Sequence, residues 1–205
     1  MCGISGAVGL KNISELLFEG IKNLEYRGYD SCGVALINNS SILIKKDIGG
    51  VEEFYRKHNV LQYKSKIGIA HTRWATHGKV TKGNTHPFTS RDGNFAVVHN
   101  GIISNYRPLR AQLQKEGFKF SSETDTEVVA HLIHAKRETT DTLTEAVKLA
   151  VKDLEGAYAL GAIHIKEPQV VAAARKGSPL VLGMGSNENL IASDQLAIAD
   201  YADKF

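Results

Sequence analysis

The hydrophobic residues of this chain fall either into short apolar runs or into stripes with helical spacing. The runs are rich in Val and Ile or alternate in polarity, which is typical of β-strands. We expect nine strands, at Ile4–Val8, Gly33–Ile37, Ile42–Lys45, Ile67–His71, Phe95–His99, Ala157–Ile165, Val170–Ala174, Leu180–Gly183 and Leu190–Ala192.

Apolar residues three and four positions apart predict four helices. The first has Ser14 as its expected N-cap and ends by Gly28, and the second is capped by Asn105 and ends at Gly117. The last two begin with the pattern of a capping box, in which a Thr side chain and a Glu three residues later pair with backbone N–H groups. These start at Thr124 and at Thr142.

The order of these elements bears on the fold class. The strands are not separated one by one by helices, as they would be in a doubly wound parallel sheet. Hairpin-like runs of strands alternate with a helical stretch, which favours a layered α+β architecture. A chain of 205 residues fits one such domain.

Composition excludes several classes of protein. The chain is 42% hydrophobic and carries a net charge of +3 that is spread along the sequence, so we expect neither a nucleic-acid nor a membrane partner. No apolar run approaches the roughly 18 residues of a membrane span, and no secretory signal is present. Two cysteines give no disulfide framework and favour a reducing cytoplasm.

Cys2 is the first candidate for chemistry. Removal of Met1 would leave a thiol and a free α-amino group on one residue, and an amine with a pKa of ~7.7–8.0 is suited to act as a general base. The alternative is a small buried apolar residue, which is how most free cysteines behave. Cys32 lacks these features, and we interpret it as structural.

The segment from His71 to Gly78 follows a predicted strand and combines Arg, Trp, Thr and His with glycine. Such a segment makes a poor core and a good binding loop, in which Arg73 would present a planar fork to a carboxylate. A surface arginine and a core tryptophan are the alternative. His71 and His77 do not have the four-residue spacing of a helical zinc pair, so we expect no metal.

Two further motifs carry open alternatives. Asn100-Gly101 is either a type I′ hairpin turn or an oxyanion hole made by the Asn100 side-chain amide and the Gly101 N–H. Asp125 either caps a helix, where acids suit the helix dipole, or faces a pocket and pairs with an ammonium group.

Together these motifs resemble one family. Met1-Cys2-Gly3-Ile4, Arg27-Gly28-Tyr29-Asp30-Ser31, His71-Thr72-Arg73-Trp74-Ala75-Thr76-His77-Gly78, His99-Asn100-Gly101, Thr124-Asp125-Thr126-Glu127 and Ile191-Ala192-Ser193-Asp194 occur in the order found in the glutaminase domains of glutamine–fructose-6-phosphate aminotransferases. The resemblance covers nearly the whole chain. It implies an N-terminal nucleophile hydrolase fold, a four-layer αββα sandwich of two antiparallel sheets between helices.

The resemblance also implies a reaction and a set of roles. Cys2 would attack the side-chain amide of L-glutamine, and Asn100 and Gly101 would hold the oxyanion. Arg73 would bind the substrate carboxylate and Asp125 its ammonium group. Trp74, Thr76 and His77 would complete the pocket. No cofactor or metal is expected.

The family's full-length enzymes carry a second, sugar-phosphate isomerase half that receives the ammonia and makes glucosamine 6-phosphate. Nothing in residues 1–205 resembles it, so we expect this chain to be a single glutaminase domain whose partner is that missing half. A homo-oligomer is expected only for the full-length form. Two alternatives stay open: a non-catalytic glutamine-binding module, and an unrelated N-terminal-cysteine enzyme without an amino-acid clamp.

Overall fold

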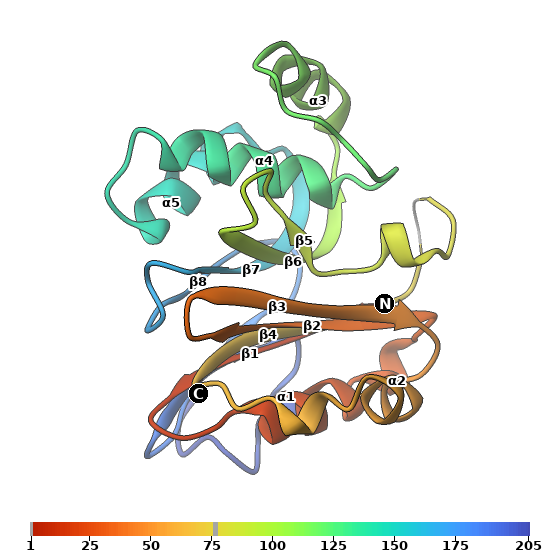
Figure 1. The fold of residues 1–205 in the computed structure, drawn as a ribbon, viewed down its shortest axis with the longest axis vertical. Helices are drawn as coiled ribbons and strands as arrows, with labels where there is room; N and C mark the ends of the chain where they lie inside the picture. Colours follow the sequence, from red (N-terminus) through yellow and green to blue (C-terminus); the bar gives the residue numbers. More distant parts are fainter. Residues whose placement is uncertain (1, 76–77) are drawn as a thin grey trace.

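The computed structural model describes residues 2–75 and 78–205, and they form two stacked antiparallel sheets between two helical layers (Figure 1). One sheet has six strands in the order β3-β2-β4-β1-β10-β9 and the other has four in the order β5-β6-β7-β8. All of their pairings are antiparallel. This is the layered α+β architecture that the order of elements predicts.

The six-stranded sheet comes from both ends of the chain. Its strands are β1 (Gly3–Gly9), β2 (Ser31–Asn38), β3 (Ser41–Ile48), β4 (Ile67–Arg73), β9 (Val181–Met184) and β10 (Glu188–Ala192). The four-stranded sheet comprises β5 (Phe88–Thr89), β6 (Phe95–Ile103), β7 (Gly156–His164) and β8 (Val171–Lys176). The nine predicted strands are all present, and only the two-residue β5 was not predicted.

The described residues form five α-helices. They are α1 (Ser14–Lys22), α2 (Val51–His58), α3 (Tyr106–Lys115), α4 (Thr126–Arg137) and α5 (Leu143–Asp153). Four of them cover the outer faces of the sheets, while α3 packs against α4. In Figure 1, α1 and α2 lie under the six-stranded sheet, while α4 and α5 lie over the four-stranded one. Short 3₁₀ turns are found at Glu25–Arg27, Val60–Gln62, Lys82–Asn84 and Gln195–Ala197.

The sequence did not predict α2. Its buried residues are Val51, Phe54 and Tyr55, which have the i, i+3, i+4 spacing of a helix, but the segment is short and has no capping side chain of its own. Glu25 supplies the cap from elsewhere, because its carboxylate accepts a 2.7 Å hydrogen bond from the Val51 N–H. A local sequence pattern cannot predict a cap that comes from a residue 26 positions away.

Of the two predicted capping boxes, one forms its threonine half and the other is absent. The Thr142 hydroxyl accepts a hydrogen bond from the Glu145 N–H at the start of α5, as expected. No capping box forms at Thr124, because the Glu127 carboxylate instead accepts hydrogen bonds from the N–H groups of Ser121 and Ser122. The N-cap residue of α4 is Asp125, whose side chain makes no capping hydrogen bond.

The first two predicted helices, which correspond to α1 and α3, also begin or end differently from the prediction. The N-cap of α1 is Ile13, and the Ser14 hydroxyl donates to the Tyr63 carbonyl instead of capping. The helix ends at Lys22, and the chain continues through a 3₁₀ turn to Gly28. Asn105 occupies the N-cap position of α3, but its side chain bonds to the backbone of residues 153 and 155.

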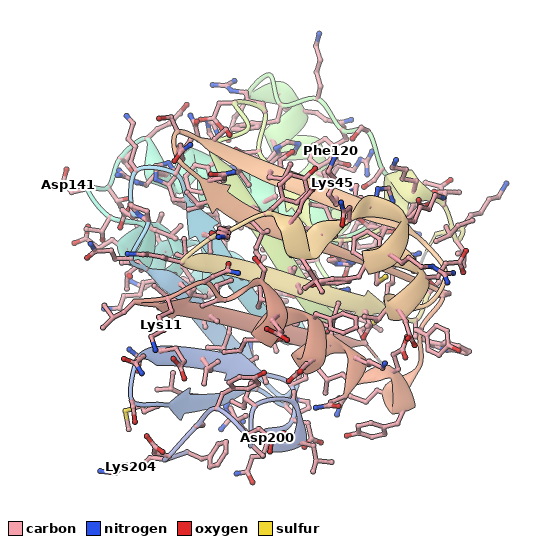
Figure 2. All side chains as sticks on the ribbon, turned by 60° about the horizontal axis from the view of Figure 1, so that its bottom comes forward. Lys11, Lys45, Phe120, Asp141, Asp200 and Lys204 are labelled. Carbon is pink, nitrogen blue, oxygen red and sulfur yellow. The ribbon has the colours of Figure 1, made fainter. Side chains whose placement is uncertain are left out.

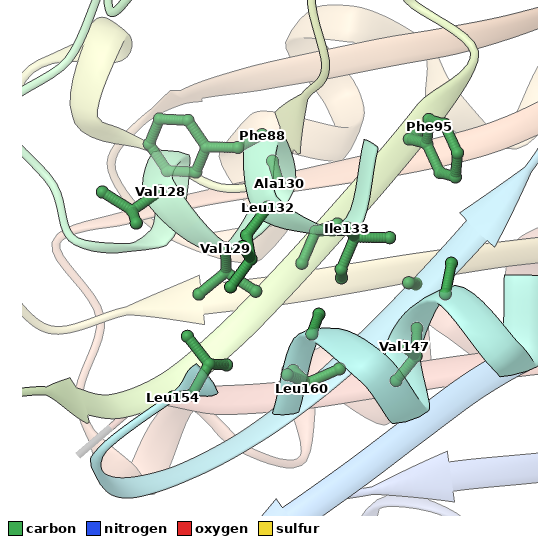
Figure 3. Packing of buried hydrophobic residues seen from close by; sticks show 14 of the residues in the cluster. Phe88, Phe95, Val128, Val129, Ala130, Leu132, Ile133, Val147, Leu154 and Leu160 are labelled. Atoms are coloured by element: carbon green, nitrogen blue, oxygen red, sulfur yellow. The ribbon is translucent and has the colours of Figure 1, made fainter. Parts of the chain in front are cut away.

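Three apolar clusters hold the layers together. One lies between the sheets and includes Ile4, Ile69 and Val98, and a second joins α1 and α2 to the six-stranded sheet. The third packs α4 and α5 against β6 and β7 through residues such as Ile133 and Leu160 (Figure 3). Strands covered on both sides are buried along their whole length, as β4 is, which explains their continuous apolar character.

The outside of the domain carries charges of both signs. Lys11, Asp141, Asp200 and Lys204 are exposed, and Figure 2 shows Asp141 far from Asp200 and Lys204, which both lie in the C-terminal segment. Of the helices in the described ranges, none is long and apolar enough to cross a bilayer.

Candidate active site

The strand order places Cys2 at the end of a central strand. β1 begins at Gly3 and lies between β4 and β10. Cys2 is therefore adjacent to the end of β4, which is formed by Arg73 and followed by Trp74. Gly3 is required for close packing, because a Cβ there would lie 2.7 Å from both Leu24 Cβ and Thr72 Oγ1. The backbone at Gly3 is therefore closely packed against Leu24 and Thr72.

The Cys2 thiol contacts the backbone of the β4 loop. The Trp74 N–H donates to Sγ at 3.2 Å, and the Trp74 carbonyl lies 3.5 Å from Sγ. Burial raises the pKa of the Cys2 thiol above its ordinary value, although the Trp74 N–H and the Arg73 charge act in the opposite direction. Burial at this position therefore favours the neutral thiol over the thiolate.

The backbone carbonyl of Cys2 is held by two side chains. Arg27 Nε and Asn100 Nδ2 each donate to this oxygen at 3.1 Å. Arg27 also lies 3.8 Å from Asp194, whose carboxylate accepts a 2.7 Å hydrogen bond from the Tyr26 hydroxyl. Arg27 and Asp194 both lie in sequence motifs, but no role was predicted for either residue.

Asn100-Gly101 does not form a hairpin turn. Both residues lie within β6, paired with Ala159 and Tyr158 of β7. Gly101 has a φ of 110°, and a Cβ there would come 2.1 Å from the Ala157 carbonyl oxygen, so no larger residue fits. The turn alternative is wrong, and the pair stands instead beside the Cys2 backbone.

One pocket brings several of the candidate residues together, although Asn100 is not part of its described lining. Its described lining consists of Cys2, Arg73, Trp74, His86, His99, Gly101, Thr124, Asp125 and Thr126. Cys2, Arg73, Trp74, Gly101 and Asp125 were expected from the sequence. His86, His99, Thr124 and Thr126 were not assigned a role.

Arg73 and Asp125 contribute opposite charges to this pocket, one from the end of strand β4 and the other from the start of helix α4. Arg73 ends β4 and is almost fully buried, with Nη1 donating to the Lys79 carbonyl at 3.3 Å. Asp125 stands at the start of α4, and its Oδ2 accepts a 2.8 Å hydrogen bond from the Ile103 N–H. A buried cation and a buried anion beside a thiol match the two charged groups of a free amino acid.

Two backbone contacts shape the loop after β4. The Trp74 ring lies over Gly28, where a Cβ would be 2.9 Å from the indole, and Gly28 has a φ of 115°. The Asp30 carboxylate accepts a hydrogen bond from the Ala75 N–H. Thr76 and His77, which the sequence analysis assigned to the pocket, lie outside the described residues.

Metal binding would need a cluster of donor side chains. Within residues 2–75 and 78–205, no group of three or more His, Cys, Asp or Glu side chains is arranged to hold a metal ion.

Comparison with known proteins agrees with this geometry. A family model described as glutamine amidotransferase domain matches residues 71–200. Proteins named glutamine–fructose-6-phosphate aminotransferase (isomerizing) from Acinetobacter baylyi and Pseudomonas aeruginosa are 52% and 50% identical over 205 and 206 aligned residues. These alignments cover 100% of this chain but 33% and 34% of the relatives, so the chain spans about a third of their length.

A solved structure supports the fold. The glutamine phosphoribosylpyrophosphate amidotransferase of B. subtilis, complexed with ADP and GMP, superposes with a TM-score of 0.82 at 30% identity and covers 97% of this chain and 43% of that one. A glutamine aminotransferase class-II domain protein from Silicibacter pomeroyi, 17% identical with a TM-score of 0.65, has the same fold. The two stacked antiparallel sheets and the structural match show the N-terminal nucleophile hydrolase fold. Because the family model also matches more than half of the chain, this chain belongs to the glutamine amidotransferase domain family.

Proposed function

We propose that this domain hydrolyses L-glutamine to glutamate and ammonia with Cys2 as the nucleophile. The observation that carries the proposal is one pocket in which the Cys2 thiol is flanked by the buried Arg73 guanidinium and the buried Asp125 carboxylate. Arg73 binds the α-carboxylate of glutamine and Asp125 its α-ammonium group, which leaves the side-chain amide directed at the sulfur. Trp74 completes the described part of this pocket.

The base for the first step is the α-amino group of Cys2 once Met1 is removed. It accepts the thiol proton as Sγ forms a bond to the amide carbon, and the carbonyl electron pair moves to oxygen. The protonated amine then delivers its proton to the leaving nitrogen, the C–N bond breaks, and ammonia departs. Water attacks the resulting γ-glutamyl thioester, and glutamate leaves with the thiol restored.

The negatively charged oxygen of each tetrahedral intermediate is held by Asn100 Nδ2 and the Gly101 N–H. The two Asn100 amide hydrogens are directed at the Cys2 carbonyl and at Ser193 Oγ. The Cys2 carbonyl also accepts from Arg27, so Asn100 can turn one hydrogen to the oxyanion without leaving that carbonyl unpaired. A donor of this kind contributes on the order of 3 kcal/mol in a transition state.

The use of the ammonia depends on the rest of the full-length protein. Because the relatives named glutamine–fructose-6-phosphate aminotransferase are about three times as long, we assign the ammonia to glucosamine 6-phosphate synthesis from fructose 6-phosphate. The partner is the sugar-phosphate isomerase part of the same protein, residues 1–205 being its single glutaminase domain. The full-length protein is a cytoplasmic homo-oligomer that needs no cofactor for glutamine hydrolysis.

The test is a glutamate-release assay on protein whose N-terminal mass has been verified. We expect turnover only from chains that begin at Cys2, and none from a Cys2→Ala variant of unchanged fold. A glutamine analogue bearing an electrophile should label Cys2, with Cys32→Ala as the matched control that labels normally. An adduct on any other residue, or near-wild-type turnover by Cys2→Ala, would contradict the proposal.

A further inference from the structure

A buried histidine stands behind the oxyanion donor. His71 lies on β4 of the six-stranded sheet and Asn100 on β6 of the four-stranded sheet, and both are buried. His71 Nε2 is 2.9 Å from Asn100 Oδ1 and 3.1 Å from the His99 carbonyl oxygen. These contacts cross from one sheet to the other directly beneath the proposed reaction centre.

The chemistry of the partners determines the direction of these hydrogen bonds. The His99 carbonyl can only accept, so Nε2 of His71 must carry the proton. The Asn100 atom facing Nε2 is then the carbonyl oxygen, which directs the amide nitrogen to the opposite side. There the Cys2 carbonyl, which also can only accept, receives an Asn100 hydrogen. Two independent acceptors therefore specify the same orientation of the carboxamide.

Ser193 completes the restraint on the nitrogen side. Its hydroxyl oxygen accepts from Asn100 Nδ2 at 2.8 Å and from the Ile4 N–H at 2.8 Å. Ile4 lies on β1, two residues after Cys2, so Ser193 ties the amide to the strand that carries the nucleophile. The restraint on the oxygen side comes from His71.

His71 remains neutral in this position. It is fully buried and its ring stacks on His86 with centroids 4.0 Å apart. Burial lowers the pKa of His71 to about 3, with Arg73 acting in the same direction. The contacts require a proton on Nε2, and burial disfavours a second proton on Nδ1.

We propose that His71 is a positioning residue that fixes the Asn100 carboxamide with its nitrogen toward the Cys2 reaction centre, an inference that rests on the proposed glutamine hydrolysis. Without the His71 donor, the carboxamide can rotate and present its oxygen to the developing negative charge. That charge exists only in the transition state, so the loss falls on kcat and leaves KM nearly unchanged.

Two substitutions at His71 form a matched pair. The amide nitrogen of a Gln reaches about as far as Nε2, whereas that of an Asn reaches about as far as Nδ1, which has no hydrogen-bond partner among the described atoms. We expect His71→Asn to lower kcat on the order of tenfold to a hundredfold, since complete loss of one oxyanion donor costs about 10²–10³-fold. His71→Gln should recover most of that loss, with KM for glutamine within about threefold in both variants.

A second measurement separates positioning from damage to the fold. Alkylation of Cys2 by iodoacetamide has no oxyanion, so His71→Asn should be alkylated at nearly the wild-type rate while it hydrolyses glutamine slowly. In an Asn100→Ala background, His71→Asn should cause no further loss, because the residue it positions is gone.

The outcomes distinguish this inference from the proposed function. If wild-type protein starting at Cys2 does not release glutamate, the proposed function fails. If the wild type is active but His71→Asn and His71→Gln have equal kcat, or the His71→Asn and Asn100→Ala losses multiply, the positioning role is wrong. A parallel loss of alkylation and hydrolysis in His71→Asn would likewise overturn it in favour of a structural role.

Discussion

The Asp30 carboxylate accepts a 2.5 Å hydrogen bond from the backbone N–H of Ala75, and this contact fixes the loop that touches the nucleophile. The second Asp30 oxygen accepts from the Ser31 hydroxyl at 2.7 Å, and the Asp30 N–H donates to the Arg73 carbonyl. Trp74, whose N–H points at Cys2 Sγ, is thereby held between two residues anchored to Asp30. The loop is positioned by a residue more than forty positions earlier in the chain.

Replacement of Asp30 should therefore reduce activity without unfolding the domain. We expect Asp30→Ala to lower kcat/KM at least tenfold, since a hydrogen bond to a charged group contributes about 1.5–3 kcal/mol. Asp30→Asn keeps an acceptor oxygen and should lose less. Steady-state glutamine kinetics with a thermal melt provide the measurement, and kcat/KM of Asp30→Ala equal to wild type would show that the loop does not depend on this contact.

Arg73 should govern binding of glutamine. Arg73→Ala removes the partner of the α-carboxylate, so we expect KM to rise on the order of tenfold to a hundredfold. Arg73→Lys keeps the charge but loses the planar fork, so the KM of this variant for glutamine should remain well above the wild-type KM. The check is glutamine saturation kinetics, and a KM that changes little in Arg73→Ala would favour a thiol enzyme without an amino-acid clamp.

The reactivity of Cys2 should depend on two nearby charges of opposite sign. The Asp30 charge raises the pKa of the Cys2 thiol and the Arg73 charge lowers it. Asp30→Asn should therefore shift the pH profile of iodoacetamide alkylation to lower pH, and Arg73→Gln should shift it to higher pH. Alkylation rates between pH 6 and 10, followed by mass mapping of Cys2, test this. Shifts in the same direction for both variants would contradict it.

The domain should lose stability in mild acid because burial disfavours the protonated form of several histidines. Burial lowers the pKa of His71 to about 3 and also lowers the pKa values of His86 and His99. The unfolded chain takes up protons below a pKa of about 6.5, so the free energy of unfolding falls as pH falls below that value. For His71 the loss continues until the pH approaches its folded pKa.

Urea denaturation at several pH values measures this dependence. Each histidine excluded from protonation contributes a slope of about 1.4 kcal/mol per pH unit below pH 6. His71→Gln should reduce the total slope by about that amount, whatever its effect on stability at pH 8. An unchanged slope would mean that His71 is protonated in the folded domain.

The elements of the fold could largely be predicted from periodicity, because burial of one face imposes it locally. The nine strands and the Thr142 cap of α5 followed from patterns spanning only a few residues. The failed predictions of helix caps have a common cause. Glu127 and Asn105 have side chains suited to local capping, yet both bond to backbone groups outside their predicted caps.

The candidate site was only partly predictable for the same reason. Cys2, Arg73 and Asp125 were recognised by residue type and motif, and the structure brings all three to one pocket. The roles of Arg27, Asp30 and Ser193 went unrecognised, although each lies in a motif that the sequence analysis quoted. Their partners are far away in the chain, as Ser193 is from Asn100, and no local pattern reports such a pairing.

The sequence by itself determined which segments become strands and helices and which side chains can act as nucleophile, cation and anion. Those properties depend on residue type and on spacing within a few positions. The tertiary structure alone decided that Asn100-Gly101 continues a strand and that the Asn100 amide faces Cys2. Stacking the two sheets places His71 on one side of that carboxamide and the Cys2 carbonyl on the other, and hydrogen-bond donors and acceptors allow only one orientation between them.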